Sequence, residues 1–194
     1  MARWQPDAPA RLVEAALGLF IEKGYEQTTV VEIADRAGVT KSTFFRHFPD
    51  KREVLFGGET FGQMVAKGIA AAPATATPIE AVGVAIEAVG TNAFTPATRE
   101  FSRRRRQVIA SNTELQERDA LKGTRTAAAM ADALRARGVP DTTARLTAQV
   151  GSLALKMAYE RWSDSSNDED FAEVAHRALR ELQSAGASLL TSPT

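Results

Sequence analysis

Apolar side chains recur every three or four positions along most of the chain, which is the spacing that places them on one face of an α-helix. The first run covers residues 7–23. A short second run stops at Gly38, and a third covers residues 41–48. Gly24, Gly38 and Pro49 follow the three runs, and such residues end helices because glycine adopts left-handed backbone angles and proline cannot continue a helix. The pattern therefore predicts three helices near the N-terminus.

Capping residues stand before the second and third runs. Thr29 and Glu32 have the spacing of a capping box, in which each side chain accepts a hydrogen bond from the other residue's backbone amide. Thr40 is placed to cap the third helix, after the three-residue turn 38–40. Two short helices joined by such a turn and braced by an earlier helix form the helix-turn-helix pattern. Helical hairpins also occur in purely structural roles, so the pattern alone leaves DNA binding open.

The rest of the chain is also helical in pattern. Asp50 and Glu53 predict a cap for one helix over residues 50–70, which contains the pair Gly57 and Gly58 as a point where it could bend. Further helices are predicted over residues 79–93, 96–111, 113–137, 142–163 and 169–190. No stretch has the alternating pattern of a strand, so the sequence predicts an all-α protein.

Composition excludes several classes of protein. The chain of 194 residues has no cysteine, which excludes disulfides, thiol catalysis and zinc sites with cysteine ligands. No apolar stretch approaches the roughly 20 residues of a membrane span, and the first residues lack the apolar run of a signal peptide. We therefore expect a cytoplasmic protein without a membrane partner. Its formal net charge is zero, but residues 41–52 hold four cations and one anion, which makes a local site for phosphate contacts.

The polar residues of the third predicted helix favour DNA binding. Donors are clustered on an element of about two turns, although a short structural helix could carry the same residues as a solvated face. The segment TTVVEIADRAGVTKSTFFRHFPDK, residues 28–51, resembles the DNA-binding segment of TetR-family repressors. The resemblance implies a helix-turn-helix domain over residues 1–52 and a helical ligand-binding and dimerisation domain over residues 53–194. It also implies a regulator, expected to be a repressor, that binds a palindromic double-stranded DNA operator as a dimer.

Family roles carry over to individual positions. Thr29, His47 and Lys51 resemble residues that contact phosphates, and the start of the third helix would face base edges. Phe45 stands where the family usually has tyrosine, so one phosphate hydrogen bond is lost and apolar contact, for instance with a thymine methyl group, remains. Phe48 is expected in the core. The predicted DNA-binding residues are Thr29, Thr40, Lys41, Ser42, Thr43, Phe44, Phe45, Arg46, His47 and Lys51.

The last two predicted helices favour a homodimer. The helix over residues 142–163 is apolar nearly all round, which requires burial on more than one side. A four-helix bundle across a two-fold axis would provide it, although these helices could also simply complete their own core. The residues predicted at the dimer contact are Leu146, Val150, Leu153, Met157, Phe171 and Leu182.

Residues 103–106 are four consecutive arginines. Helical phase places Arg105 on the inward side, where a guanidinium needs an anionic partner. That partner is either a protein carboxylate (Glu80, Glu87 or Asp119) or the acidic group of a ligand. The segment RRRRQVIASNTELQERDALK, residues 103–122, resembles an actinobacterial TetR subgroup linked to acyl-chain or CoA-like effectors, which implies an acidic amphiphile. The residues predicted around that effector are Phe61, Met64, Phe94, Phe101, Arg105, Met130 and Trp162.

Catalytic chemistry finds no support in the sequence. His47 lies in the helix-turn-helix segment, and His176 has no partner at the spacing of a metal site or catalytic pair. Neither a phosphate-binding glycine loop nor a nucleophile elbow is present. We therefore expect that the protein is not an enzyme and that it binds no cofactor and no metal. A helical protein-interaction module that has lost DNA binding is the remaining alternative, and the sequence gives neither operator nor effector.

Overall fold

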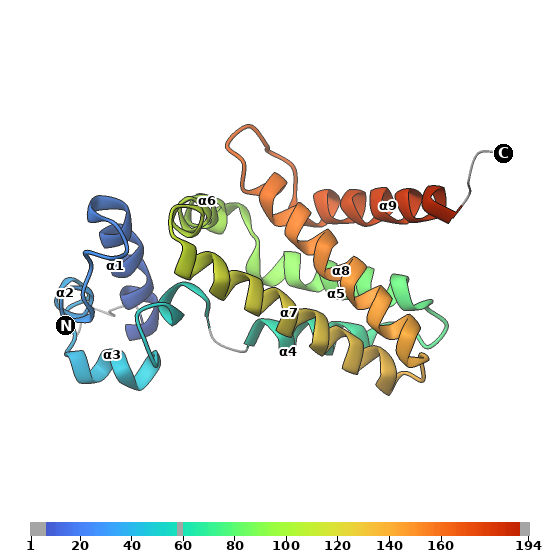
Figure 1. The fold of residues 1–194 in the computed structure, drawn as a ribbon, viewed down its shortest axis with the longest axis horizontal. Coiled ribbons are helices and arrows are strands. Elements are labelled where there is room, and N and C mark those ends of the chain that lie inside the picture. Colours follow the sequence, from blue (N-terminus) through green and yellow to red (C-terminus); the bar gives the residue numbers. More distant parts are fainter. Residues whose placement is uncertain (1–6, 58–59, 191–194) are drawn as a thin grey trace, which may run out of the picture. The chain divides into compact units, whose positions relative to one another are not determined.

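The computed structural model describes residues 7–57 and 60–190, and every regular element in these ranges is a helix (Figure 1). The predicted all-α fold is thus confirmed. The helices are α1 (Ala8–Lys23), α2 (Val30–Arg36), α3 (Lys41–His47), the 3₁₀ helix η1 (Glu53–Leu55), α4 (Thr60–Ala71), α5 (Pro78–Ala93), α6 (Pro96–Ala110), α7 (Thr113–Ala136), α8 (Asp141–Trp162) and α9 (Phe171–Leu190). Among the described residues, none of these helices combines the length and apolar character that crossing a membrane requires.

The chain forms two compact units. The first unit joins residues 1–58 to residues 104–120, and the second joins residues 59–103 to residues 121–194. Helices α6 and α7 therefore each contribute residues to both units. The predicted division of functions at residues 52 and 53 stays a prediction, because compactness does not say which residues carry a function.

In the first unit, α1 packs against α2, α3 and η1. The core of this unit includes Leu12, Leu17, Ile33 and Phe44, whose side chains are fully buried. The expected caps of α2 and α3 are present: Thr29 and Glu32 form a capping box, and Thr40 accepts a hydrogen bond from the amide of Thr43 at 3.1 Å. Asp7, by contrast, makes no capping hydrogen bond to α1.

The predicted single helix over residues 50–70 is wrong. Asp50 accepts hydrogen bonds from the amides of Arg52 and Glu53, but the turn that it caps is only the 3₁₀ helix η1. Gly57 then has a φ of +63°, a left-handed conformation that leaves the helical path, and α4 begins at Thr60. The preference of glycine for this conformation outweighs the helical periodicity around it.

The core of the second unit is formed where α4 packs on α5, α8 packs on α9, and α5 contacts both α8 and α9. Trp162, at the end of α8, is fully buried, and Phe171, at the start of α9, is 2% exposed. Their rings meet edge to face with centroids 5.8 Å apart. This aromatic contact closes the α8–α9 corner and fixes the start of α9 against the core.

The capping box of α2 predicts a pH-dependent contribution to stability. Hydrogen bonds from the Lys23 ammonium and then from Thr29 lower the pKa of Glu32 from 4.5 to about 2. A lowered carboxyl pKa stabilises the fold above pH 4.5, and the contribution is lost as the pH falls toward 2. At pH 7, E32Q should therefore unfold at a lower urea concentration than the wild type, and the difference should disappear near pH 2. The control is E117Q, at an exposed glutamate. If the urea concentration at which E32Q unfolds depended on pH in the same way as that of E117Q, the role assigned to Glu32 would be contradicted.

A close approach of α4 to α5 predicts a second effect. A Cβ atom on Gly68 would lie 2.6 Å from the Ala85 Cα atom, so the backbone must shift to accept it. Gly68→Ala should lower the free energy of unfolding by about 2 kcal/mol. Gly123→Ala is the matched control, because a Cβ on this helical glycine meets no atom within 4 Å, and alanine should there stabilise by roughly 0.5–1 kcal/mol. Thermal unfolding followed by circular dichroism measures both changes. A change in the free energy of unfolding with the same sign in both variants would count against the close packing of α4 on α5.

Candidate nucleic-acid interface

The outer face of α3 carries a compact set of exposed polar side chains. Of the ten residues predicted to bind DNA, seven are exposed: Thr29, Thr40, Lys41, Ser42, Phe45, Arg46 and His47. Thr43 is half-buried, and its hydroxyl group accepts a hydrogen bond from Arg46 at 3.0 Å. Helix α3 thus presents hydroxyl, ammonium, guanidinium and imidazole groups within seven residues. This set can serve both phosphates and base edges.

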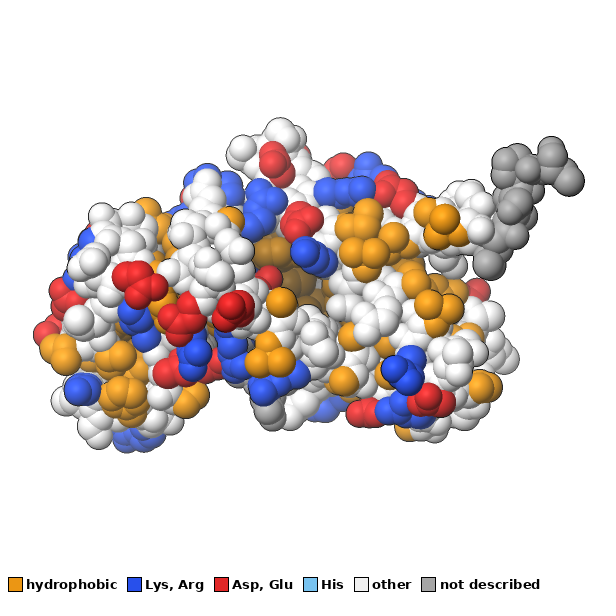
Figure 2. All heavy atoms as spheres, viewed as in Figure 1, with side chains coloured by type: hydrophobic (Ala, Val, Ile, Leu, Met, Phe, Trp, Pro, Cys, Tyr) orange, Lys and Arg blue, Asp and Glu red, His pale blue; other side chains and the backbone are white. Residues whose placement is uncertain are grey.

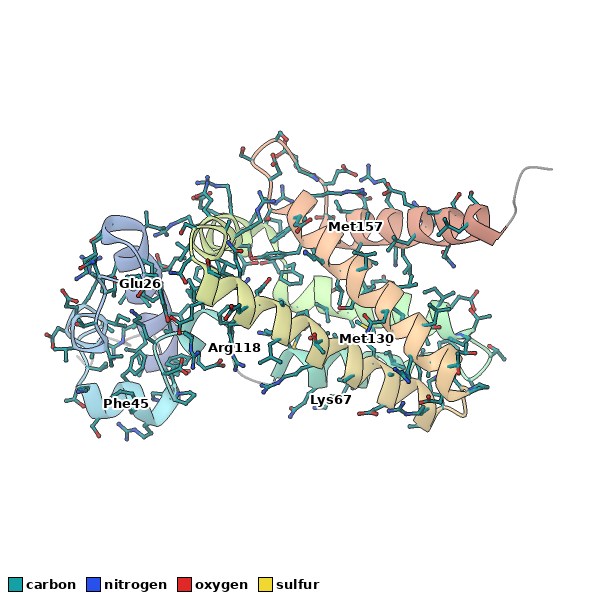
Figure 3. The ribbon with its side chains drawn as sticks, in the orientation of Figure 1. Glu26, Phe45, Lys67, Arg118, Met130 and Met157 are labelled. Atoms are coloured by element: carbon teal, nitrogen blue, oxygen red, sulfur yellow. The ribbon has the colours of Figure 1, made fainter. Side chains whose placement is uncertain are left out.

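Two neighbouring phenylalanines of α3 have opposite environments. Phe44 is fully buried, so its side chain belongs to the core of the first unit and does not reach the outer face. Phe45 is 48% exposed, with its ring centroid 5.9 Å from the Lys41 ammonium group (Figure 3). The ring is held edge to face against Phe44 at 5.4 Å. Phe45 is therefore a supported, outward-facing apolar surface among the polar groups.

The Lys51 ammonium group has partners inside the first unit. It donates hydrogen bonds to the carbonyl oxygens of Tyr25 and Thr28, at 2.7 and 3.0 Å, and lies 4.0 Å from the centroid of the Tyr25 ring. Partial burial lowers the pKa of Lys51, against the attraction of Glu26 and Glu114. Lys51 thus ties the segment after α3 to the turn before α2. These two hydrogen bonds use two of the three N–H donors of the ammonium group.

Thr29 has a local role as well. Its hydroxyl group donates to a Glu32 carboxylate oxygen at 2.7 Å and accepts from the Glu32 amide at 3.3 Å. Lys23 forms an ion pair with the same glutamate. The N-terminus of α2 is therefore fixed by side chains on three segments of the first unit.

The predicted effector residues fall into two groups. In the second unit the ring of Phe94 contacts those of Phe61 and Trp162, with centroids 6.0 Å apart for Phe61–Phe94 and 5.6 Å for Phe94–Trp162. Met130 is fully buried in the core of the same unit, and Met64 packs against that core. Phe101 is half-buried. Of the seven, only Arg105 belongs to the first unit.

Arg105 has internal partners. Its Nε donates to the carbonyl oxygen of Leu55 at 2.6 Å, and its Nη2 lies 3.4 Å from a carboxylate oxygen of Asp119. The guanidinium carbon is 5.0 Å from the centroid of the Phe56 ring. Only 14% of the side chain is exposed, as the helical phase predicted, and Asp119 is one of the three carboxylates considered as partners.

Two open depressions lie on the second unit, and neither is lined by the predicted effector residues. One, of about 920 Å³, lies at the α8–α9 corner and carries the ion pairs Arg161–Glu181 and Arg177–Glu169. The other, of about 260 Å³, lies between α5 and α9 beside Val84. Both depressions are open to solvent and include charged side chains in their lining, so they differ from an enclosed site for a long apolar ligand.

Helix α8 carries an apolar row that its own unit leaves uncovered. Leu146 is 65% exposed and Leu153 is 47% exposed, while Val150 and Met157 are half-buried. Figure 2 shows hydrophobic side chains gathered over α8 and α9. Leu182 of α9 is also half-buried. Phe171 differs from the prediction, because its ring lies 4.3 Å from that of Phe94 inside the core and is not available to a second copy.

Sequence reasoning missed residues whose roles depend on distant contacts. Tyr159 belongs to the aromatic cluster, with its ring centroid 5.4 Å from that of Phe94 and its hydroxyl group donating to the Ser102 carbonyl oxygen. Tyr25 is 6% exposed beneath Lys51. The aromatic residue types were visible in the sequence, but no local signal gave their partners.

Family models match both parts of the chain. Residues 12–56 match the model described as "Bacterial regulatory proteins, tetR family". Residues 76–187, more than half of the chain, match the model described as "MftR C-terminal domain".

Curated relatives match the N-terminal part. The HTH-type transcriptional regulator TcmR of Streptomyces glaucescens is 39% identical over 80 residues, which cover 41% of this chain and 35% of that protein. The transposon Tn10 TetC protein of Escherichia coli is 46% identical over 44 residues, or 23% of this chain and 22% of TetC. The matched region thus spans about a third or less of these relatives' length.

Solved structures share the fold over nearly the whole chain. A TetR-family regulator from Syntrophomonas wolfei has a TM-score of 0.61 at 20% identity, covering 96% of this chain and 98% of that one. The regulator FadR of Bacillus subtilis, solved in complex with stearoyl-CoA, has a TM-score of 0.57 at 20% identity, covering 89% and 96%. The matched families and relatives are regulators rather than enzymes, in agreement with the sequence-based prediction. This chain belongs to the TetR family of bacterial regulatory proteins.

Proposed function

We propose that this chain is a cytoplasmic transcriptional repressor that binds a palindromic DNA operator as a homodimer and responds to a small effector. The observation that carries the proposal is the exposed set of donors on α3, in a helix-turn-helix unit of the matched family. Lys41, Ser42 and Arg46 would reach base edges and phosphates, and Phe45 would meet a thymine methyl group. Thr29 and His47 would contact the flanking phosphates, with Lys51 contributing its remaining N–H.

The dimer is supported by the apolar row on α8. Leu146, Val150, Leu153 and Met157 follow one another at helical spacing, and two of them are largely exposed. Burying this row against a second copy, together with Leu182 of α9, would remove it from water. The same pairing would give the two-fold symmetry that a palindromic operator needs.

The effector that we propose is an acidic amphiphile with a long apolar chain. Support comes from the stearoyl-CoA complex of Bacillus subtilis FadR, whose fold this chain shares, and from the half-buried rings of Phe61 and Phe94. Its apolar part would lie along these rings in the second unit, next to Met64 and Trp162. Because Arg105 has Leu55 and Asp119 as partners, we assign it an internal role and not the recognition of the acidic group.

Selection from a random pool of DNA duplexes tests the regulator and the dimer together. The wild type should select a two-fold symmetric sequence with half-sites about 34 Å apart and should sediment as a dimer. Leu153→Glu should produce monomers and weaken operator binding by more than about tenfold, because a charge would be buried in the dimer contact. Leu121→Glu is the control, since Leu121 is 43% exposed on α7 and lies outside the row. A monomeric wild type that protects one half-site would contradict the dimer, and absence of any selected sequence would favour a protein-interaction module.

Calorimetric titration with stearoyl-CoA, stearate and CoA tests the effector class. We expect heat of binding from the first two compounds and none from CoA alone. Phe94→Leu removes ring contacts worth about 1 kcal/mol, so the affinity should fall roughly fivefold. Arg105→Ala should leave the affinity unchanged and lower only the unfolding temperature. Selective loss of binding in a folded Arg105→Ala protein would instead place the acidic group of the ligand at this arginine.

A further inference from the structure

The corner between α6 and α7 belongs to the same compact unit as the helix-turn-helix. Residues 104–120 group with the N-terminal residues, although about 50 residues separate them from η1 along the chain. Val108, Ile109 and Leu115 of this corner are buried, the last completely. The corner is therefore a built part of the unit that carries α3.

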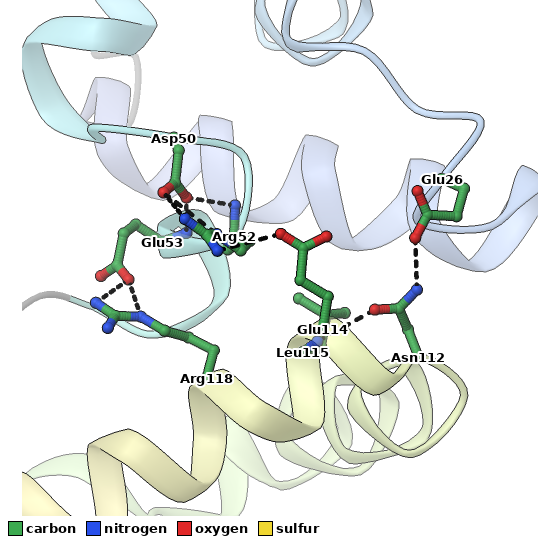
Figure 4. A network of polar contacts seen from close by, with 8 residues as sticks. All are labelled: Glu26, Asp50, Arg52, Glu53, Asn112, Glu114, Leu115 and Arg118. Atoms are coloured by element: carbon green, nitrogen blue, oxygen red, sulfur yellow. Dashed lines mark hydrogen bonds and ion pairs between the residues drawn. The ribbon is translucent and has the colours of Figure 1, made fainter.

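An ion pair joins α7 to the segment after α3. Arg118 donates to the Glu53 carboxylate through Nε and also approaches it through Nη2 (Figure 4). Only 10% of the Glu53 side chain and 23% of the Arg118 side chain are exposed. A glutamate so enclosed depends on its cation, because an unpaired charge in this position would be strongly unfavourable. Arg118 therefore fixes η1 to the second turn of α7.

Glu114, one turn earlier on α7, reaches the same segment. Its carboxylate lies 3.3 Å from Arg52, whose other end is paired with Asp50 at 2.8 Å. Burial raises the pKa of Tyr25, and the nearby Glu114 carboxylate raises it further. Glu114 thus contacts both Arg52 and Tyr25, the residue whose carbonyl oxygen and ring hold Lys51.

A third link reaches the turn before α2. The Asn112 side chain donates to Glu26 at 2.9 Å and accepts from the Leu115 amide at 3.1 Å, so it caps α7 and binds the turn at once. Glu26 lies three residues before Thr29. The corner therefore holds both ends of the helix-turn-helix, through Glu26 before α2 and through Glu53 after α3.

We propose that Asn112, Glu114 and Arg118 are positioning residues for DNA binding: they hold the α6–α7 corner and the helix-turn-helix together as one body and so fix the orientation of α3 within it. The inference rests on the proposed function and deepens the account of the same site. None of the three residues needs to touch DNA.

The first experiment needs neither DNA nor effector. Hydrogen exchange should accelerate together in α7, η1 and α3 of Arg118→Met, because one body opens cooperatively. Arg135→Met is the matched control: it removes an arginine from the far end of α7, paired with Asp132 and Asp141, and should leave exchange in α3 unchanged. Faster exchange confined to α7 would overturn the proposal. If Arg118→Met does not fold, Glu114→Gln, which removes a half-exposed partner, takes its place.

The second experiment uses the selected operator and stearoyl-CoA. Arg118→Met should weaken operator binding by roughly tenfold, while its direct affinity for stearoyl-CoA stays that of the wild type. Wild-type operator affinity in folded Arg118→Met would overturn the proposal.

A reversible tether supplies the rescue. The chain has no cysteine, so Glu26→Cys and Asn112→Cys can be joined selectively by a short bis-methanethiosulfonate reagent. In the Arg118→Met background the tether should restore operator binding, and dithiothreitol should remove the effect. In the otherwise unaltered chain the tethered protein should keep its response to stearoyl-CoA, and loss of the response would show that the corner slides on the helix-turn-helix. If the wild type selects no operator, the proposed function fails, while hydrogen exchange still decides whether the corner and α3 form one body.

Discussion

Helices α2 and α3 are seven residues long each, and helices of this length are not stable alone in water. Their shape therefore depends on interactions from outside themselves. Threonine caps satisfy the first amides of both helices, and the fully buried Ile33 and Phe44 attach them to α1. The polar face of α3 is available for recognition only because the opposite face of the helix is packed into the core of the unit. Contact between α3 and DNA therefore depends on this packing.

The same constraint explains why the unit extends beyond residue 57. The three short elements around α1 do not by themselves provide a cation for the Glu53 carboxylate or enclose the ring of Tyr25. Helix α7 supplies the partners, namely Arg118 and Glu114. The family resemblance describes a DNA-binding segment of about 50 residues, but the stable body is larger and discontinuous in sequence.

Local chemistry made part of this structure predictable. Local sequence determines the caps at Thr29 and Thr40 and the end of the helix before Gly24, because each depends on residues at most four positions apart. The structure contains all three. The inward phase of Arg105 followed from helical geometry alone. Asp119 was one of the three carboxylates considered as its partner, but Leu55 was not foreseen, because it lies 50 residues away and the periodicity of one helix carries no information about another. Gly57 and Gly58 marked a possible bend, but the end of the helix there was not predicted, because the apolar pattern continues through it and the left-handed conformation of Gly57 is not visible in that pattern.

The use of cations inside the first unit also limits how it can bind DNA. Residues 41–52 contain four lysines and arginines, which suggested a dense phosphate site. Lys51 donates two of its three N–H groups to carbonyl oxygens, and Arg52 forms ion pairs with Asp50 and Glu114. Lys41 and Arg46 then remain as the cations of α3 that face outward. Fewer phosphate contacts per subunit mean a weaker dependence of affinity on salt, since each neutralised phosphate releases counterions. Under the proposed function, recognition would then draw more on base-edge contacts, on the apolar surface of Phe45 and on the proposed pairing of two subunits than on charge.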